Sequence, residues 1–202
     1  MMSLIITGFF TSFALILAIG AQNAFVFRQG LLGHHLFAVA LTCAASDAIL
    51  IALGVAGFGV LVEQFPSLPI AMRYAGAAFL FVYGALRLLA AYKGNGHLEM
   101  GKPAGSLRAT VLTCLALTWL NPHVYLDTLG LLGAVSTQYE PISSKVIFGI
   151  SAISASFVFF FSLAYGAKLM QKVMQSARAW QLMDLGIGVL MWLLAAGLIL
   201  SD

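Results

Sequence analysis

Two aspartates lie deep inside long apolar stretches of the sequence, where an ionised side chain is costly. Asp47 lies about eleven residues into its stretch, which is roughly 16 Å along a helix that rises 1.5 Å per residue and close to the centre of a bilayer. Asp127 lies well inside another stretch. A carboxylate at that depth costs about 2.5–3.5 kcal/mol on insertion scales, and such residues are usually functional. We therefore predict that both aspartates bind a cation or exchange protons; the alternative is that Arg28 or Arg87 pairs with them and only holds helices together.

A proline interrupts the apolar stretch that contains Asp127, in the segment TWLNPHVYLDT (Thr118–Thr128). Pro122 removes a backbone donor and disfavours the α conformation at Asn121, so the helix should break there. Asn is a good N-cap and Pro is favoured at the first helical position, so the chain can stop, be capped and restart. A restarted helix would direct free N–H groups and its positive end into the protein, where a carboxylate can bind. The alternative is a simple proline kink whose free backbone groups bond to neighbouring helices.

Further polar residues lie beside this break and at a second candidate break. His123 is four residues before Asp127 and shares a helix face with it, so the pair could bind a cation or exchange a proton; the alternative is a histidine that is only hydrogen-bonded. In the first apolar stretch, Gln22 and Asn23 follow Gly20. A glycine followed by two amides predicts a second break, with amide groups lining a cavity. Polar packing between helices is the alternative.

The remaining polar residues of the apolar stretches have structural interpretations. Asp184 lies just inside the last stretch, where we expect its carboxylate to complement the positive N-terminal end of a helix. The two aspartates described first would then be the only acidic residues well inside the apolar stretches. Ser46, Ser151, Ser154 and Ser156 are expected to hold neighbouring helices together.

These residues belong to elements that must cross a membrane. The chain has 202 residues, of which 61% are hydrophobic and 8% charged, with a mean hydropathy of +0.99. A soluble domain has about 25% charged residues, so the chain has too few charges to cover a water-facing surface. A membrane-spanning helix needs about 20 apolar residues, and we predict an all-α polytopic membrane protein with six transmembrane helices, the first and fourth of them broken. The six stretches are Ser3–Phe27, Leu36–Val62, Leu68–Tyr92, Leu107–Gly133, Val146–Leu169 and Gln181–Leu200.

The rest of the composition argues against several classes of function. The net charge of +3 includes ten basic residues that lie mostly between apolar stretches, as the positive-inside rule expects, and form no run that would bind nucleic acid. Cys43 and Cys114 lie far apart in apolar stretches, which predicts small buried side chains rather than a disulfide or a metal site. The sequence shows no plausible nucleophile–base arrangement. We predict a protein that is not an enzyme and binds no metal or cofactor.

The two halves of the sequence resemble each other faintly. Asn23-Ala-Phe-Val-Phe is echoed by Asn121-Pro-His-Val-Tyr, and Gly-Leu-Leu-Gly follows both, beginning at Gly30 and Gly130. Three helices per repeat would make the repeats inverted, with a substrate site where they meet near the midplane.

We predict one transmembrane domain over residues 1–202. It would comprise a first repeat at about 1–92, a loop at 93–106 and a second repeat at about 107–202. Lys and Arg near the helix ends number seven on one side and two on the other. Because positive charge favours the cytoplasmic side, both termini should lie outside.

Four segments closely resemble the bacterial lysine/arginine exporter family. They are GAQNAFVFRQG (Gly20–Gly30), ASDAILI (Ala45–Ile51), TWLNPHVYLDT (Thr118–Thr128) and ISASF (Ile153–Phe157). The likeness covers essentially the whole chain. QNAFV and NPHVYLD resemble the basic-amino-acid branch of a superfamily that also holds threonine and homoserine exporters.

The resemblance implies a secondary carrier of the bacterial inner membrane that expels L-lysine or L-arginine by antiport against protons. It implies no soluble cofactor, and the family allows a homodimer. The residues that it carries over as functional are Gln22, Asn23, Asp47, Asn121, Pro122 and Asp127.

Two buried carboxylates and a helix N-terminus together suit a zwitterion with an additional positive charge. We expect the helix end to take the α-carboxylate, and Asp47 and Asp127 to take the amino and side-chain cations, with protonation of a carboxylate weakening the hold on the substrate. Lysine and arginine both fit. The alternatives are a threonine or homoserine exporter, a divalent-cation exporter, for which hard cations require six or more oxygen ligands, and a thiol–disulfide carrier using Cys43 and Cys114. The predicted substrate-binding residues are Gln22, Asn23, Asp47, Asn121, Pro122, His123 and Asp127.

Overall fold

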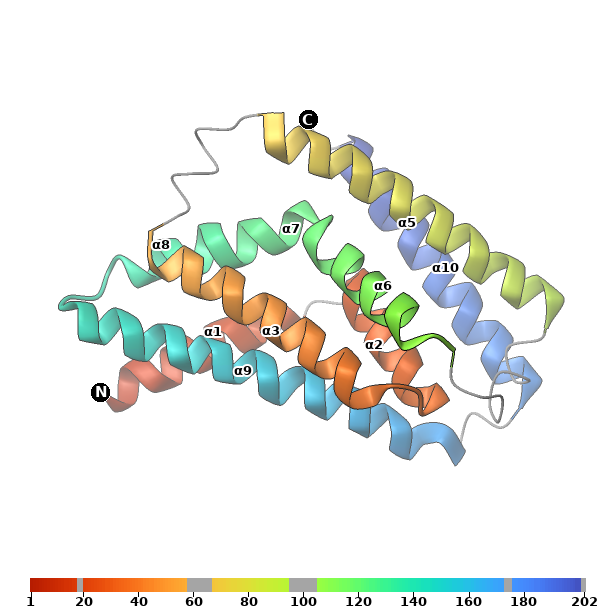
Figure 1. The fold of residues 1–202 in the computed structure, drawn as a ribbon, viewed down its shortest axis with the longest axis horizontal. Helices are drawn as coiled ribbons and strands as arrows, with labels where there is room; N and C mark the ends of the chain where they lie inside the picture. The colour runs from red at the N-terminus through yellow and green to blue at the C-terminus, as the bar shows by residue number, and fades with distance from the viewer. Residues whose placement is uncertain (18–19, 58–66, 95–104, 173–175, 201–202) are drawn as a thin grey trace.

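The computed structural model describes residues 1–17, 20–57, 67–94, 105–172 and 176–200, and within these ranges it contains helices and no strand (Figure 1). The all-α class predicted from the sequence is therefore confirmed for the described part of the chain. The α-helices are α1 (Met2–Leu17), α2 (Ala21–Leu32), α3 (Leu36–Val55), α5 (Ser67–Lys93), α6 (Leu107–Trp119), α7 (Pro122–Tyr125), α8 (Gly133–Ser136), α9 (Ile142–Leu169) and α10 (Ala177–Leu200); a π-helix (Leu126–Leu132) joins α7 to α8, and a 3-10 turn (Met170–Lys172) follows α9.

Among the described residues, four helices are long and apolar enough to cross a membrane: α3, the part Arg73–Lys93 of α5, α9 and α10. Helices α1 and α2 form a pair bent by 82°, which counts as a fifth span if the pair is taken together. The fourth predicted stretch contains no single long helix, because α6 has only 13 residues and ends at Trp119. The prediction of six spans is thus confirmed for four to five, and the inverted repeats stay a prediction.

The predicted ends of the apolar stretches agree with the helices in most places. The stretch Val146–Leu169 lies within α9, and Gln181–Leu200 lies within α10, which begins earlier, at Ala177. Residues 58–62 of the second stretch lie outside the described residues, as do 95–104 of the predicted loop.

Helices α5 and α10 pack along each other beside the other helices (Figure 1). Trp192 of α10 joins the pair, because its ring stacks on Phe81 of α5 with 5.3 Å between centroids. Its indole N–H also donates to the Phe81 carbonyl oxygen at 3.1 Å. On the other side of the molecule, α9 packs against α1, α2 and α3. A cavity lies between these two groups of helices.

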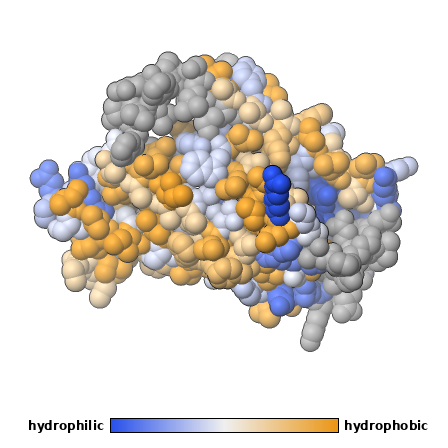
Figure 2. All heavy atoms as spheres, in the orientation of Figure 1, coloured by the Kyte–Doolittle hydropathy of each residue, from blue (hydrophilic) through white to orange (hydrophobic). Residues whose placement is uncertain are grey.

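Large apolar side chains face outward on several helices. Phe10, Phe37, Leu126 and Leu193 are exposed by 62%, 60%, 64% and 66%. Figure 2 shows hydrophobic residues across the middle of the visible face and hydrophilic residues toward its two ends. An apolar surface of this extent is unusual for a soluble monomer and matches the hydrocarbon core of a bilayer.

Two glycines allow helices to approach closely near the cavity. A Cβ atom at Gly54 of α3 would overlap the Thr128 carbonyl oxygen of the π-helix. A Cβ atom at Gly30 of α2 would lie 2.5 Å from the Ala164 carbonyl oxygen of α9. Small residues at such contacts let backbones pack tightly in a membrane. The contact at Gly54 fixes the two helices that carry the predicted site aspartates against each other.

Candidate functional site

The break predicted at Gly20 lies where the sequence indicated. Helix α1 ends at Leu17 and α2 begins at Ala21, with Gly20 in an extended conformation (φ −120°, ψ 175°). The Asn23 side-chain amide donates to the Ile16 carbonyl oxygen at 2.7 Å. This hydrogen bond satisfies a carbonyl that the end of α1 leaves free, so Asn23 ties the two halves of the broken helix together.

The break predicted at Asn121-Pro122 also lies where the sequence indicated, and its capping is confirmed. Helix α6 ends at Trp119, Asn121 is the N-cap of α7, and Pro122 stands in the first turn. The Asn121 Oδ1 atom accepts a hydrogen bond from the His123 backbone N–H at 3.1 Å. Across the break, the Tyr125 hydroxyl donates to the Trp119 carbonyl oxygen at 2.9 Å. The chain therefore stops, is capped and restarts, which a simple proline kink would not do.

The two breaks meet at one cavity of about 320 Å³. Six of the seven predicted site residues line it, and Pro122 is the one that does not, because it contributes the backbone turn rather than a wall of the cavity. The lining also includes apolar residues of the α5–α10 pair and of α9. The predicted residues on its wall are Gln22, Asn23, Asp47, Asn121, His123 and Asp127. The wall also includes Ser12, Gly20, Leu80, Phe160, Leu194 and Leu198.

Asp47 reaches the cavity from α3 and is 4% exposed. Its Oδ2 atom accepts a hydrogen bond from the Ser156 hydroxyl of α9 at 2.9 Å, and Ser156 is fully buried. On the neighbouring residue, the Ser46 hydroxyl oxygen accepts from the Trp119 indole N–H at 3.1 Å. A hydrogen bond to a carboxylate fixes the orientation of its oxygens, so Ser156 positions Asp47 at the wall of the cavity.

Asp127 reaches the same cavity from the π-helix that continues α7. It is partly buried, whereas His123, one turn earlier, is exposed. The Thr128 hydroxyl donates to the Val124 carbonyl oxygen at 2.5 Å, within the same segment. π-Helical segments inside α-helices are rare and often occur at functional sites. The segment brings Asp127 and His123 to one face, as their spacing indicated.

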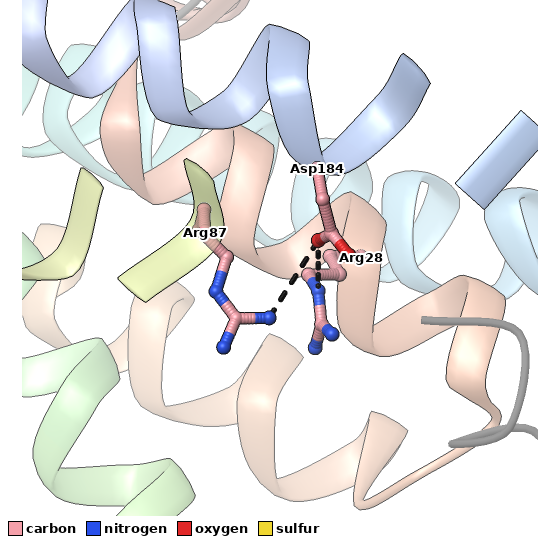
Figure 3. Close-up of polar contacts among 3 residues, drawn as sticks. All are labelled: Arg28, Arg87 and Asp184. Atoms are coloured by element: carbon pink, nitrogen blue, oxygen red, sulfur yellow. Dashed lines mark hydrogen bonds and ion pairs between the residues drawn. The ribbon is translucent and has the colours of Figure 1, made fainter. Parts of the chain in front are cut away.

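Asp184 corrects one interpretation made from the sequence. Because α10 begins at Ala177, Asp184 lies two turns inside the helix and is fully buried. Its Oδ1 atom lies 3.1 Å from Arg28 Nε of α2 and 3.6 Å from Arg87 Nη1 of α5 (Figure 3). The expected role at a helix end is wrong, since that effect fades within the first turn. Asp184 is also a third acidic residue well inside an apolar stretch, whereas the sequence interpretation placed only Asp47 and Asp127 there.

This ion-pair cluster bears on the alternative given for the site aspartates. Arg28 and Arg87 were the residues proposed to pair with Asp47 and Asp127. In the structure these two arginines bind Asp184 instead. Asp47 lines the cavity and accepts a hydrogen bond from Ser156.

Sequence reasoning missed Ser12 as a cavity residue and the carboxylate contact of Ser156. Ser12 lines the cavity and is fully buried. In the sequence it lies within the first apolar stretch, where nothing marks it as a cavity residue. Ser156 was expected to pack between helices, and it does so through Asp47. Ser156 could have been singled out because it belongs to the segment ISASF, which resembles the exporter family. Ser12 belongs to no such segment.

Two observations bear on the alternative chemistries, and one of them is that the Cys43 and Cys114 side chains are neighbours in the structure. In the described ranges, no three His, Cys, Asp or Glu side chains gather as a metal site would require. Cys43 and Cys114 are free thiols and both are buried in the hydrophobic core, as predicted.

Comparison with known proteins identifies the family to which the chain belongs. Residues 13–202 match the family described as LysE type translocator. The chain belongs to this family. Relatives named arginine exporter protein ArgO, from Salmonella enteritidis PT4 and Salmonella typhimurium (strain LT2), are each 39% identical over 196 residues, which is 96% of the chain and 92% of the relative. No solved structure matches. The chain is therefore a multi-pass membrane transporter and not an enzyme.

Proposed function

We propose that the chain exports basic L-amino acids, arginine and lysine, from the bacterial cytoplasm across the inner membrane. The observation that carries the proposal is the pair of carboxylates, Asp47 and Asp127, on the wall of one cavity between broken helices. Opposite charges are needed to hold a cationic side chain at membrane depth. The relatives named arginine exporters support arginine as a substrate.

The size and lining of the cavity suit a single amino acid. Its volume of about 320 Å³ lies at the lower end of small-molecule pockets, which span roughly 300–1,000 Å³. Leu80, Phe160, Leu194 and Leu198 supply apolar walls, against which the methylene groups of arginine or lysine can pack. Four of the polar lining residues, Gln22, Asn23, Asn121 and His123, lie at the helix breaks, where a helix end leaves backbone groups without a partner inside the helix.

In the proposed mechanism, the cavity opens alternately to the two sides of the membrane. A substrate from the cytoplasm binds with its cationic groups at Asp47 and Asp127. Protonation of one carboxylate from the outside weakens this hold, because it removes the charge that attracts the cation. Substrate then leaves and the proton is released inward, so export is driven by the protonmotive force. Two inverted repeats rocking against each other would provide the alternation.

Counterflow in proteoliposomes tests the proposal. Purified protein is reconstituted, and exchange of labelled arginine, lysine, threonine and homoserine is measured with and without a pH gradient. We expect exchange of arginine and lysine that responds to the gradient. Asp47→Asn and Asp127→Asn should abolish exchange while protein remains in the membrane. The control is Ser154→Ala, whose hydroxyl bonds only within its own helix, to the Ser151 carbonyl oxygen.

Two results would refute the proposal. Wild-type exchange by either aspartate variant would remove the assigned role of the carboxylates. Exchange of threonine or homoserine without arginine or lysine would assign the chain to another branch of the family.

A further inference from the structure

The N-terminal end of α2 faces the cavity without a side-chain cap. Helix α2 has 12 residues and its N-cap is Gly20, which supplies no side-chain acceptor. The first N–H groups of a helix have no acceptor within the helix, and this end carries a partial positive charge. Gly20 and Gln22, on either side of the first helical residue, both line the cavity. The end of α2 is therefore presented to whatever occupies the cavity.

Two buried donors beside this helix end lack a hydrogen-bond partner in the described part of the chain. They are the Ser12 hydroxyl of α1 and the Gln22 side-chain amide nitrogen of α2, beside which lies the thiol of Cys43, a weak acceptor. Ser12 is fully buried and Gln22 is 8% exposed, and both side chains line the cavity. Buried donors are nearly always paired, so an unpaired one calls for an explanation such as a ligand. Two donors and a helix N-terminus together suit an anion.

The other helix that restarts at the cavity is less suited to an anion. There the Asn121 side chain already accepts from the His123 N–H, and α7 itself has only four residues. The negative residue Asp127 also follows directly in the π-helix. The expectation from the sequence placed the substrate carboxylate at this end, next to the groups that would repel it.

We propose that Ser12, the Gln22 amide and the first turn of α2 form the subsite for the α-carboxylate of the transported amino acid. This assignment rests on the proposed function, and it divides the cavity into two poles. The pole at α2 takes the carboxylate, and the pole with Asp47 and Asp127 takes the cationic groups. Selection for an amino acid over the corresponding amine or amide then depends on the α2 pole alone.

L-argininamide, which replaces the α-carboxylate by a neutral amide, is the probe for this subsite. Its affinity and that of L-arginine are measured by competition against labelled arginine in counterflow. We expect the wild type to prefer arginine, and Ser12→Ala to weaken arginine about 10-fold while weakening argininamide less, since a hydrogen bond to a charged carboxylate is stronger than one to a neutral amide. Gln22→Glu places a negative charge at the same position and should reverse the preference in favour of argininamide. Ser154→Ala is the matched serine control and should keep the wild-type preference.

Competition by argininamide also shows that a variant is folded, so each result decides the assignment. Equal weakening of both compounds by Ser12→Ala, or an unchanged preference in Gln22→Glu, would overturn it. Asn121→Ala could instead lose the preference for arginine over argininamide while Ser12→Ala keeps it. That result would place the substrate carboxylate at α7 and would also overturn the assignment. Failure of the wild type to exchange arginine would instead remove the proposed function, and the subsite with it.

Discussion

Replacing Asp184 by asparagine removes the carboxylate between Arg28 and Arg87, and we expect a large loss of stability. The Asp184 Oδ1 atom lies 3.1 Å from Arg28 Nε and 3.6 Å from Arg87 Nη1. The side chain of Asp184 is 1% exposed, that of Arg28 5% and that of Arg87 17%. Breaking a buried ion pair by removing one partner costs about 3–5 kcal/mol, because the remaining charge is buried without compensation. For a chain of this size, that corresponds to a fall of roughly 6–20 °C in the melting temperature.

The two arginines should contribute unequally. Arg28 lies nearer to the carboxylate and is more deeply buried, and its guanidinium lies 6.0 Å from the Trp180 ring centroid. Arg87 lies farther from the carboxylate, at 3.6 Å, and 17% of its side chain is exposed, so its ion pair should contribute less than that of Arg28. Arg28→Met should therefore lower the melting temperature more than Arg87→Met. Arg28→Met combined with Asp184→Asn should cost less than the sum of the two single changes, since the residues are in contact.

The assay is thermal unfolding of the purified variants in one detergent, followed by tryptophan fluorescence and by recovery on gel filtration. Arg178→Gln is the control, because Arg178 is exposed in the first turn of the same helix, and surface changes stay within about 0.5 kcal/mol. A melting temperature for Asp184→Asn within 2 °C of the wild type, on the scale of roughly 2–4 °C per kcal/mol, would refute the reasoning. So would a larger effect of Arg87→Met than of Arg28→Met.

Two further changes test how the cavity is built. Asn121→Ala removes the N-cap of the restarted helix and should cost about 0.5–2 kcal/mol, seen as a lower melting temperature; an unchanged value would mean that the cap does not hold the break. Gly54→Ala should reduce the yield of folded protein on gel filtration, because the new Cβ overlaps the Thr128 carbonyl oxygen, whereas Gly166→Ala, with nothing within 4 Å, should be neutral or gain up to about 1 kcal/mol from helix propensity. Equal behaviour of the two alanine variants would contradict the close packing of α3 on the π-helix.

The breaks in the helices were predictable because their causes are local. Pro122 cannot donate a backbone hydrogen bond, and Asn121 can cap the helix that follows, whatever surrounds them. Gly20 before two amides gave a similar local signal. The membrane class was equally accessible, since the scarcity of charged residues does not depend on folding. Six of the seven predicted site residues line one cavity, and those at the two breaks do so because broken helices leave polar groups that must meet each other, water or a ligand.

The fate of the buried charges was not predictable in the same way. Asp184 and Asp47 are both single carboxylates in apolar stretches, and nothing in their immediate sequence separates an aspartate bound to arginines from one that faces a cavity. The separation depends on which residues of α2, α5 and α9 lie opposite each carboxylate, and these are distant in the chain.

The amino-acid sequence by itself determined the membrane class, the two helix breaks and a short set of residues able to bind a charged substrate. These follow from side-chain transfer energies and backbone geometry, which act within a few residues. Only the tertiary structure decided that Arg28 and Arg87 bind Asp184, that Ser156 orients Asp47, and that Ser12 lies on the cavity wall. The reason is physical: the partner of a buried polar group is chosen by the packing of helices, and that packing joins residues far apart in sequence.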